Sequence, residues 1–335
     1  MNNPLPLVVA LGDPSGVGPE IAAKAWDQRD AAELPPFFVI GDQRSIEAVW
    51  AGPIHRINNP AEATACFRTA LPVLHLEDGG AITPGVPNVE GARCSIDSLE
   101  MAVGITRSGA ARALVTCPVA KAQLYAIGFT HPGQTEFIAE RCGVASANAV
   151  MMLAGPSLRV VPITTHIPLR EVADALTVEL IIAKTRATLR GLKRNFGIAE
   201  PRLVMAGLNP HAGEDGALGR EEIDIIIPAL EQLRAEGIQI IGPVPADALF
   251  HARARAGYDA ALCMYHDQAL IPLKALHFDE GVNITLGLPI IRTSPDHGTA
   301  FDIAGKNRAN PGAMIAAIQM AGAATRSRAM HAASA

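Results

Sequence analysis

Three histidines each follow an apolar run of the kind that forms a buried strand. The runs cover residues 158–165, 203–208 and 260–265, and the histidines are His166, His211 and His266. In an α/β sheet, ligands bind beyond the carboxyl ends of the strands, so three imidazoles in this context can converge on one cation. Three histidines that leave a fourth position open are typical of a catalytic zinc site. Each histidine taken alone is more often an ordinary loop residue, and only their shared position makes a metal site an equally good interpretation.

A second set of residues has the chemistry of an anion-binding site. Arg292 can hold a phosphate or carboxylate through two parallel N–H bonds, Lys274 adds a point charge, and Asn283 adds directional hydrogen bonds. Apolar residues flank Asn283 and Arg292, which favours a held side chain over one that is simply solvated. We therefore expect these three residues to bind an anionic substrate.

Two further positions allow a functional or a structural interpretation. Thr135 follows Gln134 just before a helical segment, where it can cap the helix or present its hydroxyl to an anion. Asp247 and Asp267 are candidates for orienting a metal ligand or for acid–base work, and either can instead cap a helix. A cysteine nucleophile is disfavoured, because the five cysteines are scattered and lack a C-x-x-C pair.

The elements that must position these residues alternate between strands and helices. An apolar run at residues 5–11 meets a glycine turn at 12–20 and a helical segment at 21–26. Further strands are predicted at residues 37–42, 73–76, 113–118, 149–153 and 238–241, and helices at 92–108, 178–192 and 221–236. This alternation predicts an α/β fold with mainly parallel strands and helices on both faces. At 335 residues we expect two lobes, built from non-contiguous pieces because no linker separates them.

Composition narrows the class of protein. The net charge of -5 gives no reason to expect binding to nucleic acid or to an anionic membrane. No apolar stretch approaches the roughly 20 residues that cross a bilayer, and the N-terminus lacks the features of a signal peptide. The cysteine pattern is typical of reduced thiols. We therefore expect a cytoplasmic protein.

Together these stretches resemble the 4-hydroxythreonine-4-phosphate dehydrogenase family of pyridoxal phosphate biosynthesis. The motifs that carry the resemblance are residues 12–20 (GDPSGVGPE), 164–166 (TTH), 208–214 (LNPHAGE), 242–247 (GPVPAD), 264–268 (MYHDQ), 281–289 (GVNITLGLP) and 292–294 (RTS). The loop at 297–311 is similar to the adenosine-binding loop of isopropylmalate dehydrogenases. The resemblance implies a two-lobed α/β/α fold of the isocitrate/isopropylmalate dehydrogenase type. It also implies a cofactor-binding lobe at residues 1–128 plus 280–335, and a metal-binding and dimerisation lobe at 129–279.

The same resemblance implies a site and its ligands. One divalent metal, Zn²⁺ or alternatively Mg²⁺ or Co²⁺, would be held at a homodimer interface by His166 and His211 of one subunit and His266 of the other. The phosphorylated small-molecule substrate would contact Gln134, Thr135, Lys274, Asn283 and Arg292. NAD or NADP would lie along the two loops that contain Gly12, Gly16, Gly18, His297, Gly298, Thr299, Asp302 and Asn310. Asp247 or a metal-bound hydroxide would serve as the base.

The implied activity is oxidation of 4-phosphooxy-L-threonine to 2-amino-3-oxo-4-(phosphooxy)butanoate, which loses CO₂ to give 3-amino-2-oxopropyl phosphate. Many family members carry His-Thr where this chain has Gln134-Thr135, and Gln cannot carry charge. This difference leaves open a related dehydrogenase of D-threonate or D-erythronate 4-phosphate. In another class, a zinc hydrolase or aldolase that acts on a phosphorylated metabolite would use the same histidines without a nicotinamide.

Overall fold

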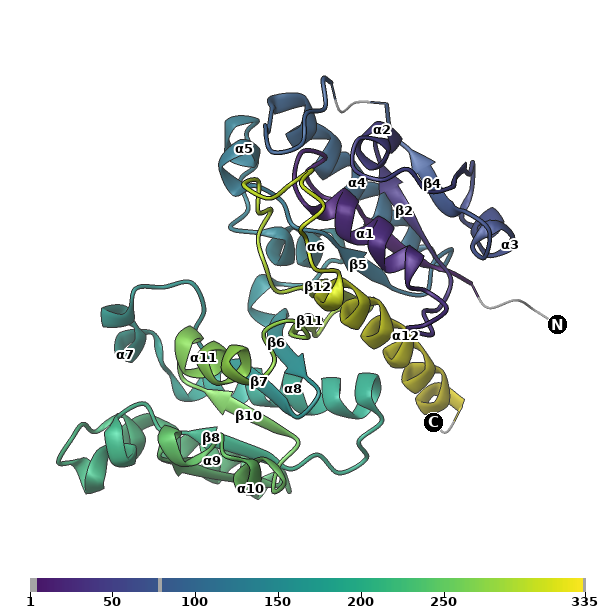
Figure 1. Ribbon diagram of the computed structural model, residues 1–335. Coiled ribbons are helices and arrows are strands. Elements are labelled where there is room, and N and C mark those ends of the chain that lie inside the picture. Colours follow the sequence, from purple (N-terminus) through teal and green to yellow (C-terminus); the bar gives the residue numbers. More distant parts are fainter. Residues whose placement is uncertain (1–4, 78–79, 334–335) are drawn as a thin grey trace. The chain divides into compact units, whose positions relative to one another are not determined.

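The internal contacts of the chain divide it into two units, each with its own run of strands (Figure 1). The computed structural model describes residues 5–77 and 80–333. Unit 1 comprises the described residues up to Ser146 together with Leu288–Ala329, and unit 2 comprises Ala147–Gly287 and the described residues from Met330. The lobe boundaries expected from the resemblance, at residues 128/129 and 279/280, remain a prediction, as do the roles assigned to the lobes.

The described residues of unit 1 form six parallel strands in the order β3-β4-β2-β1-β5-β12. They are β1 (Leu7–Ala10), β2 (Phe37–Gly41), β3 (Ile54–Arg56), β4 (Leu71–His75), β5 (Leu114–Thr116) and β12 (Arg292–Pro295). Every residue of β1 and β2 is buried. Because successive side chains of a strand point to opposite faces, layers of structure must cover both faces of this sheet. The predicted parallel α/β architecture is confirmed.

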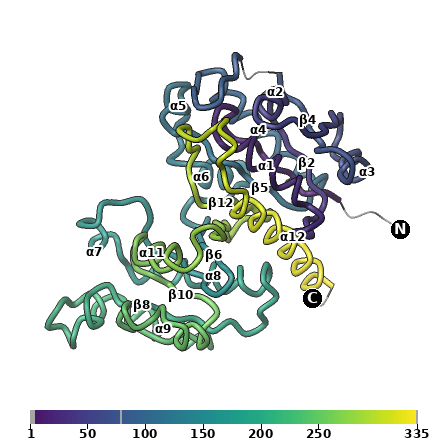
Figure 2. The backbone as a smooth tube through the Cα atoms, viewed as in Figure 1, coloured from purple at the N-terminus to yellow at the C-terminus, as the bar shows by residue number. Residues whose placement is uncertain are grey.

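The helices of unit 1 include four of eight residues or more. These are α1 (Gly18–Asp27), α4 (Val89–Arg107), α6 (Gln134–Arg141) and α12 (Gly312–Ala333). Shorter elements are α2 (Gln43–Glu47), η1 (Pro60–Glu62), α3 (Ala63–Cys66), α5 (Lys121–Ala126) and, at the unit boundary, η2 (Ser146–Asn148). Asn88 begins α4 by accepting a hydrogen bond from the Gly91 amide at 2.6 Å. Segments from both ends of the chain lie side by side here (Figure 2), and Lys24 Nζ of α1 donates to the Ala309 carbonyl just before α12.

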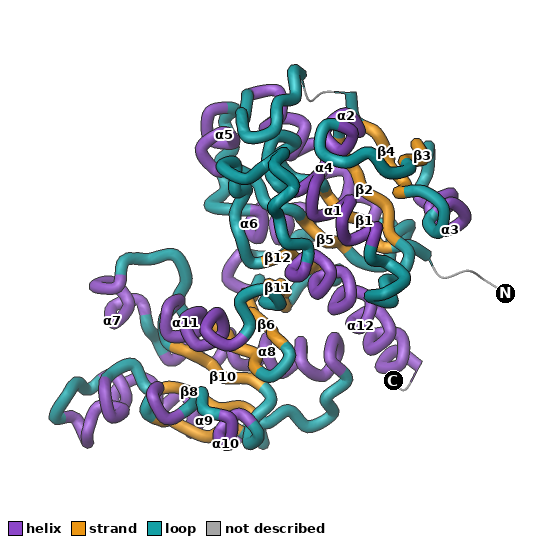
Figure 3. The backbone as a smooth tube through the Cα atoms, viewed as in Figure 1, coloured by secondary structure: helices purple, strands orange, loops and turns teal. Residues whose placement is uncertain are grey.

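Unit 2 contains six strands in the order β11-β6-β7-β10-β8-β9, shown in orange in Figure 3. They are β6 (Val150–Gly155), β7 (Leu158–Pro162), β8 (Leu203–Ala206), β9 (Ile240–Val244), β10 (Ala260–Cys263) and β11 (Val282–Leu286). The pairs β11–β6 and β6–β7 are antiparallel. The pairs β7–β10, β10–β8 and β8–β9 are parallel. The parallel half carries the candidate metal ligands.

Helices pack on the strands of unit 2. α11 (His266–Leu276) lies against β6, β7 and β10, α8 (Val178–Phe196) against β6 and β11, and α9 (Ile227–Ala235) against β9. Shorter elements are η3 (Leu169–Glu171), α7 (Val172–Ala175), η4 (Pro210–Gly216), η5 (Glu222–Ile226), η6 (Ala246–Ala248) and α10 (Ala252–Arg255). Thr177 caps the start of α8, and Gly197 ends it at a φ of 67°. The helix predicted at 221–236 begins instead with a π-helical turn, η5.

Candidate active site

Four neighbouring strands of unit 2 end at the same edge of the sheet. β7, β10, β8 and β9 pair in that order and run parallel. His166 follows β7, His266 follows β10, His211 follows β8, and Asp247 follows β9. Because the carboxyl ends of parallel strands lie on one side, all four residues belong to one edge. The structure therefore brings the three strand-end histidines and Asp247 to a common edge.

His166 and His266 lie close together at this edge. Their ring centroids are 5.6 Å apart. His266 is the first residue of α11, and its Nδ1 is 2.7 Å from Asp267 Oδ1. A carboxylate on one ring nitrogen fixes the orientation of the imidazole and leaves the other nitrogen for a metal. Asp267 therefore orients a candidate ligand. It lies in the first turn of α11, which begins after the cap residue Tyr265, so the helix-cap alternative for Asp267 is wrong.

His211 lies on a left-handed turn. Five successive residues, from His211 to Asp215, have φ values of 52°, 51°, 84°, 45° and 53°. The left-handed conformation costs roughly 1–2 kcal/mol for each residue other than glycine, and a run of it persists only where surrounding contacts enforce it. Gly213 is the one glycine among the five. The turn therefore needs support from outside itself.

That support includes the buried carboxylate of Glu222, which is only 2% exposed. Glu222 Oε1 accepts hydrogen bonds from the backbone amides of Leu208 at 2.7 Å and Asn209 at 2.8 Å. Glu222 Oε2 accepts from Asn209 Nδ2 at 2.9 Å. Hydrogen bonds to a charged acceptor contribute about 1.5–3 kcal/mol each, which is enough to offset much of the cost of the turn.

A cavity of about 310 Å³ lies beside this turn. Its lining residues are Leu208, Asn209, Pro210, His211, Ala246, Asp247, Tyr265 and Gln268. Gln268 ties two strand ends together, because its Oε1 accepts from the Met264 amide at 2.7 Å and its Nε2 donates to the Gly207 carbonyl at 2.8 Å. Asp247 lies inside the short helix η6, whose cap is Pro245, so it is not a helix cap either. The cavity thus joins His211 and Asp247 in one space.

The donor set at this edge suits a divalent metal, because neutral imidazole is a common ligand of zinc. Within the part of the chain that the structure describes, no group of three His, Cys, Asp or Glu side chains is placed to hold a metal ion. His211 is also well exposed, at 70% of its side chain. The three histidines therefore share an edge in a single chain without forming a three-ligand group there.

Lys274 and Asn283 also belong to unit 2. Lys274 lies in the last turn of α11, where its Nζ is 5.9 Å from the centroid of the Phe278 ring. Asn283 lies in β11, paired with Leu153 of β6. Its Oδ1 is buried and has no hydrogen-bond partner among the described residues. A buried polar atom without a partner is unfavourable in the absence of a ligand, which supports Asn283 as a binding residue.

Arg292, Gln134 and Thr135 belong to unit 1. Arg292 is 4% exposed and its Nη2 donates to Thr116 Oγ1 at 2.8 Å, while Gln134 Nε2 donates to the Cys117 carbonyl at 3.0 Å. Both side chains are therefore held at the carboxyl end of β5. Burial lowers the pKa of Arg292 to about 10, an effect that the Glu136 carboxylate partly offsets, so Arg292 stays charged at neutral pH.

Thr135 is the second residue of α6, and Gly133 takes the cap position without a side-chain bond. The capping alternative for Thr135 is therefore wrong. The Gln134 Oε1 atom is buried and has no hydrogen-bond partner within residues 5–77 and 80–333. Backbone N–H groups at the start of a helix attract anions. Gln134, Thr135 and Arg292 thus have the placement and chemistry of an anion site in unit 1.

The two loops expected to bind the cofactor touch each other in unit 1. The Val17 amide donates to the Thr299 carbonyl at 3.0 Å. A side chain on Gly16 would lie 3.1 Å from that same oxygen, so glycine permits the close approach. Glu20 Oε1 accepts from the Ala309 amide at 3.0 Å and from Lys24 Nζ at 2.7 Å. These contacts join the glycine turn to the last loop.

The other residues expected in these loops have mixed surroundings. Gly12 and Gly18 are required by packing, because a Cβ on either would lie 2.3 Å from a carbonyl oxygen. His297, Gly298 and Asp302 are exposed. Asn310 Oδ1 accepts from the Gly312 amide at 2.9 Å at the start of α12. Ser15 Oγ is buried and has no hydrogen-bond partner in the described part of the chain, as expected of an atom that meets a ligand.

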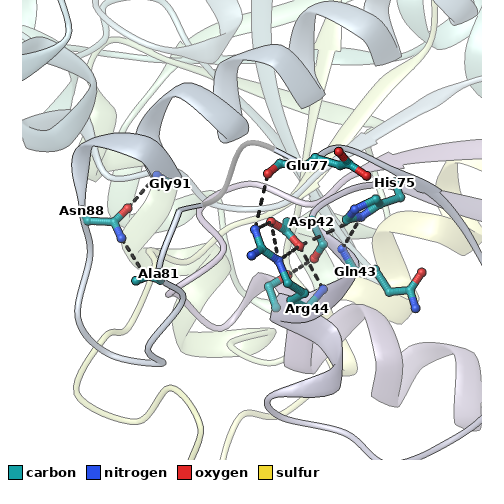
Figure 4. A network of polar contacts seen from close by, with 9 residues as sticks. Asp42, Gln43, Arg44, His75, Glu77, Ala81, Asn88 and Gly91 are labelled. Carbon is teal, nitrogen blue, oxygen red and sulfur yellow. Dashed lines mark hydrogen bonds and ion pairs between the residues drawn. The ribbon is translucent and has the colours of Figure 1, made fainter.

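A polar network surrounds the carboxyl ends of β2 and β4 in the same unit (Figure 4). The buried Asp42 carboxylate accepts from Arg44 Nε at 3.0 Å and begins α2 by accepting from the Arg44 amide. His75 Nδ1 accepts from the Gln43 amide at 3.0 Å. Asn88, in addition to capping α4, donates to the Ala81 carbonyl at 2.7 Å. These contacts fix the starts of α2 and α4 and the loops beside them.

Sequence reasoning assigned no role to four residues that organise these sites: Glu20, Thr116, Glu222 and Gln268. Each acts through a partner distant in the chain, and Arg292 and Thr116 are 176 residues apart. A signal existed for Gln268, which belongs to the motif that contains His266, and for Glu20, which ends the motif at residues 12–20. Glu222 lies in a segment that was predicted to be an ordinary helix, and a glutamate in such a helix is expected to be exposed at the surface.

The chain has two α/β units, with candidate metal ligands at parallel strand ends in one and joined glycine loops in the other. Three relatives that it matches are dehydrogenases by name. A protein of Zymomonas mobilis named 4-hydroxythreonine-4-phosphate dehydrogenase is 59% identical over 327 residues, 98% of each chain. One of the same name from Erythrobacter litoralis is 56% identical over 95% of this chain and 96% of its own. A crystal structure of that enzyme from Klebsiella pneumoniae has a TM-score of 0.85 at 35% identity, covering 96% of this chain and 98% of its own.

The family model described as pyridoxal phosphate biosynthetic protein PdxA matches residues 33–321. The chain belongs to the PdxA family. It is therefore an oxidoreductase of pyridoxal phosphate biosynthesis, and the hydrolase and aldolase alternatives are set aside. Among the residues described, no helix has the length and apolar character needed to cross a membrane.

Proposed function

We propose that this chain oxidises the C3 hydroxyl of 4-phosphooxy-L-threonine with NAD or NADP at a divalent-metal site. The hydroxyl proton passes to a base and the C3 hydride to the nicotinamide, which gives 2-amino-3-oxo-4-(phosphooxy)butanoate. This product is a β-keto acid and loses CO₂ to yield 3-amino-2-oxopropyl phosphate. The observation that carries the proposal is the common edge of His166, His211 and His266, in a chain 59% identical to a dehydrogenase of that name.

The residues present fit the metal. His166, His211 and His266 would hold Zn²⁺, with Mg²⁺ or Co²⁺ as alternatives, and Asp267 already orients the His266 ring. When bound, the metal supplies a Lewis acid that lowers the pKa of the substrate hydroxyl. Asp247, which lines the cavity with His211, is the candidate acceptor for the hydroxyl proton.

The residues also fit a phosphorylated substrate and a nicotinamide cofactor. The residues that would contact the phosphorylated substrate are Gln134, Thr135, Lys274, Asn283 and Arg292. The buried oxygens of Gln134 and Asn283 that have no partner in the described residues support these assignments. The cofactor would lie along the joined loops of unit 1. The buried Ser15 hydroxyl in these loops also has no hydrogen-bond partner in the described residues, which supports this assignment. We expect the enzyme to work in the cytoplasm.

We further propose a homodimer in which the partner contributes His266 to the metal site. Large apolar side chains are exposed around the helix that His266 begins, with Ile271 at 66% and Phe278 at 75%. Leu169, three residues beyond His166, is 69% exposed. Exposed apolar groups near candidate ligands favour a subunit interface. Sedimentation and a mixed-subunit experiment test this proposal: inactive His166→Ala and His266→Ala chains should regain activity when they are combined in one dimer.

The first test is the appearance of reduced nucleotide with 4-phosphooxy-L-threonine, measured with chelator and with added zinc. D-threonate and D-erythronate 4-phosphates are assayed in parallel, because Gln134 is the position where substrate choice can differ. Chelator-sensitive turnover that is fastest on the threonine derivative supports the proposal. Turnover restricted to the sugar acid phosphates would retain the mechanism and replace the substrate. No reduced nucleotide with any of the three would overturn it.

A further inference from the structure

The support for the His211 turn points to a residue with a specific task. Leu208 and Asn209 connect β8 to the turn, and both of their amides donate to the same oxygen of Glu222. The Asn209 side chain donates to the other oxygen of Glu222. Three donors thus converge on one buried carboxylate at the point where the chain changes from extended to left-handed backbone. Backbone hydrogen bonds within the turn, such as Ala212 N–H to the Asn209 carbonyl at 3.1 Å and Leu218 N–H to the Gly213 carbonyl at 3.0 Å, leave the amides of Leu208 and Asn209 to the carboxylate.

The surrounding backbone is shaped to admit this carboxylate. A Cβ on Gly207 would lie 3.1 Å from Glu222 Oε1, and a Cβ on Gly213 would lie 2.6 Å from Glu222 Oε2. Glycine at both positions therefore lets the chain close around the side chain. Glu222 is also the first residue of the π-helical turn η5, a feature that is frequent near functional sites. Gly207 thus leaves room for one oxygen of the Glu222 carboxylate, and Gly213 leaves room for the other.

We propose that Glu222 is a positioning residue that fixes the His211 turn in its metal-binding form before the metal arrives. This inference rests on the proposed function, because it assumes that His211 is a metal ligand. Glu222 lines no part of the cavity that His211 lines, and its action is through the backbone of residues 208–213. A turn that is already formed loses less conformational freedom on binding, so Glu222 strengthens metal binding without touching the metal.

The adjacent residue provides a matched control. Glu221 is also a glutamate and also contacts the turn, because its Oε2 accepts from Asn209 Nδ2 at 2.7 Å. It differs in that it is partly exposed and accepts from neither backbone amide of residues 208 and 209. Comparing the same substitution at Glu221 and Glu222 therefore isolates the backbone contacts.

The experiment measures the zinc affinity of full-length Glu222→Ala, Glu222→Gln and Glu221→Gln by competition with a fluorescent chelator. Loss of a residue that orients a ligand typically weakens metal binding by about 10- to 100-fold, which is the expected result for Glu222→Ala. Glu222→Gln keeps one oxygen for the two amides, so its loss should be smaller. Glu221→Gln should stay within about twofold of wild type, as surface substitutions do.

Two further readouts distinguish positioning from a general loss of structure. The KM for NAD should be unchanged in all three variants, because the cofactor loops belong to unit 1. A fold loosened throughout would raise the KM for NAD together with the zinc Kd, and this result would overturn the proposal. Hydrogen exchange on peptides covering residues 207–216 of metal-free protein should be faster in Glu222→Ala than in wild type.

A folded Glu222→Ala variant with wild-type zinc affinity would overturn the proposal. If that variant does not fold, Glu222→Gln decides instead, and affinity equal to that of Glu221→Gln would overturn it. Failure of the proposed metal site is recognisable separately, because wild-type protein would then bind no zinc. In that case the exchange measurement would still decide whether Glu222 holds the turn.

Discussion

His266 and His211 lie on the same sheet edge but are positioned in opposite ways. His266 begins a regular α-helix, and its ring is oriented by Asp267, the next residue in the chain. His211 lies on a left-handed turn whose support comes from Glu222, eleven residues later. One candidate ligand is therefore held by local structure and a neighbouring side chain. The other is held by tertiary contacts that a short peptide of the same sequence could not form.

This difference has a consequence for mutation. A locally held ligand should tolerate changes in distant residues and respond to changes at its immediate neighbour. A ligand on a strained turn should respond to any substitution that disturbs the enforcing contacts, even where the ligand itself is intact. The predictions below test this comparison.

The largest effect is expected from removing the ligands. His211→Ala and His266→Ala should each abolish zinc binding and turnover while the fold remains intact, because either loss leaves too few imidazoles for a tight site. Zinc content by mass spectrometry, activity and circular dichroism measure this. His55→Ala, at an exposed position in β3, is the matched control. Stoichiometric zinc with activity in either variant would refute the three-histidine site.

The next largest effect is expected from Gly213→Ala. Gly213 has a φ of 84°, and an added Cβ would lie 2.6 Å from Glu222 Oε2, so both strain and a clash result. We expect about 2 kcal/mol or more of destabilisation together with weaker zinc binding, measured by thermal unfolding and titration. Gly128→Ala is the control, because Gly128 has a φ of 85° with no atom within 4 Å of an added Cβ. It should lose about 1 kcal/mol and keep its zinc affinity.

A smaller effect is expected at the locally held ligand. Asp267→Asn should weaken zinc binding by about tenfold, because an amide oxygen still accepts from the His266 ring but carries no charge. The contacts between Glu222 and the His211 turn should not change in Asp267→Asn. Combining Asp267→Asn with Glu222→Gln should therefore give additive losses in the free energy of zinc binding. Asp279→Asn, at an exposed position of the same unit, is the control. Strong non-additivity would show that the two ligands share one support.

The smallest effect is expected at Gln134 in unit 1. Gln134→His should lower the KM for the phosphorylated substrate by about fivefold at pH 6, since a protonated imidazole binds phosphate more strongly than an amide does. The gain should fade by pH 8, above the ordinary imidazole pKa of about 6.5. Zinc affinity should not change. Gln28→His, on an exposed residue, is the control. A KM of Gln134→His that equals the wild-type KM at both pH values would contradict the role of Gln134.

Much of the fold could be predicted from the sequence. Apolar runs and glycine turns indicated the strands, and the histidines that follow three of them do lie beyond neighbouring parallel strands. This prediction succeeded because the carboxyl ends of parallel strands lie at one edge of the sheet, so the residues that follow the strands lie at that edge too. The burial of Arg292 was predicted for a different reason, because its apolar neighbours indicated that it would be held within the structure.

The supports of the site could not be predicted in this way. The left-handed turn at His211 contains four residues other than glycine that avoid this conformation in isolation, so no local signal marks it. The π-helical turn at Glu222 has the same hydrophobic spacing as the start of an ordinary helix. The bond from Arg292 to Thr116 spans 176 residues, and only the packed sheet brings these side chains together.

The contacts between the two loops of unit 1 affect when each part of the protein can fold during synthesis. The glycine turn is made first, but Thr299 and Ala309, whose backbone groups bond to Val17 and Glu20, emerge about 280 residues later. Unit 2, in contrast, is nearly continuous in sequence. Domains fold as their residues become available during synthesis. We therefore expect the sheet edge with the three histidines to form on the nascent chain, whereas the two loops of unit 1 come together only when translation is almost finished.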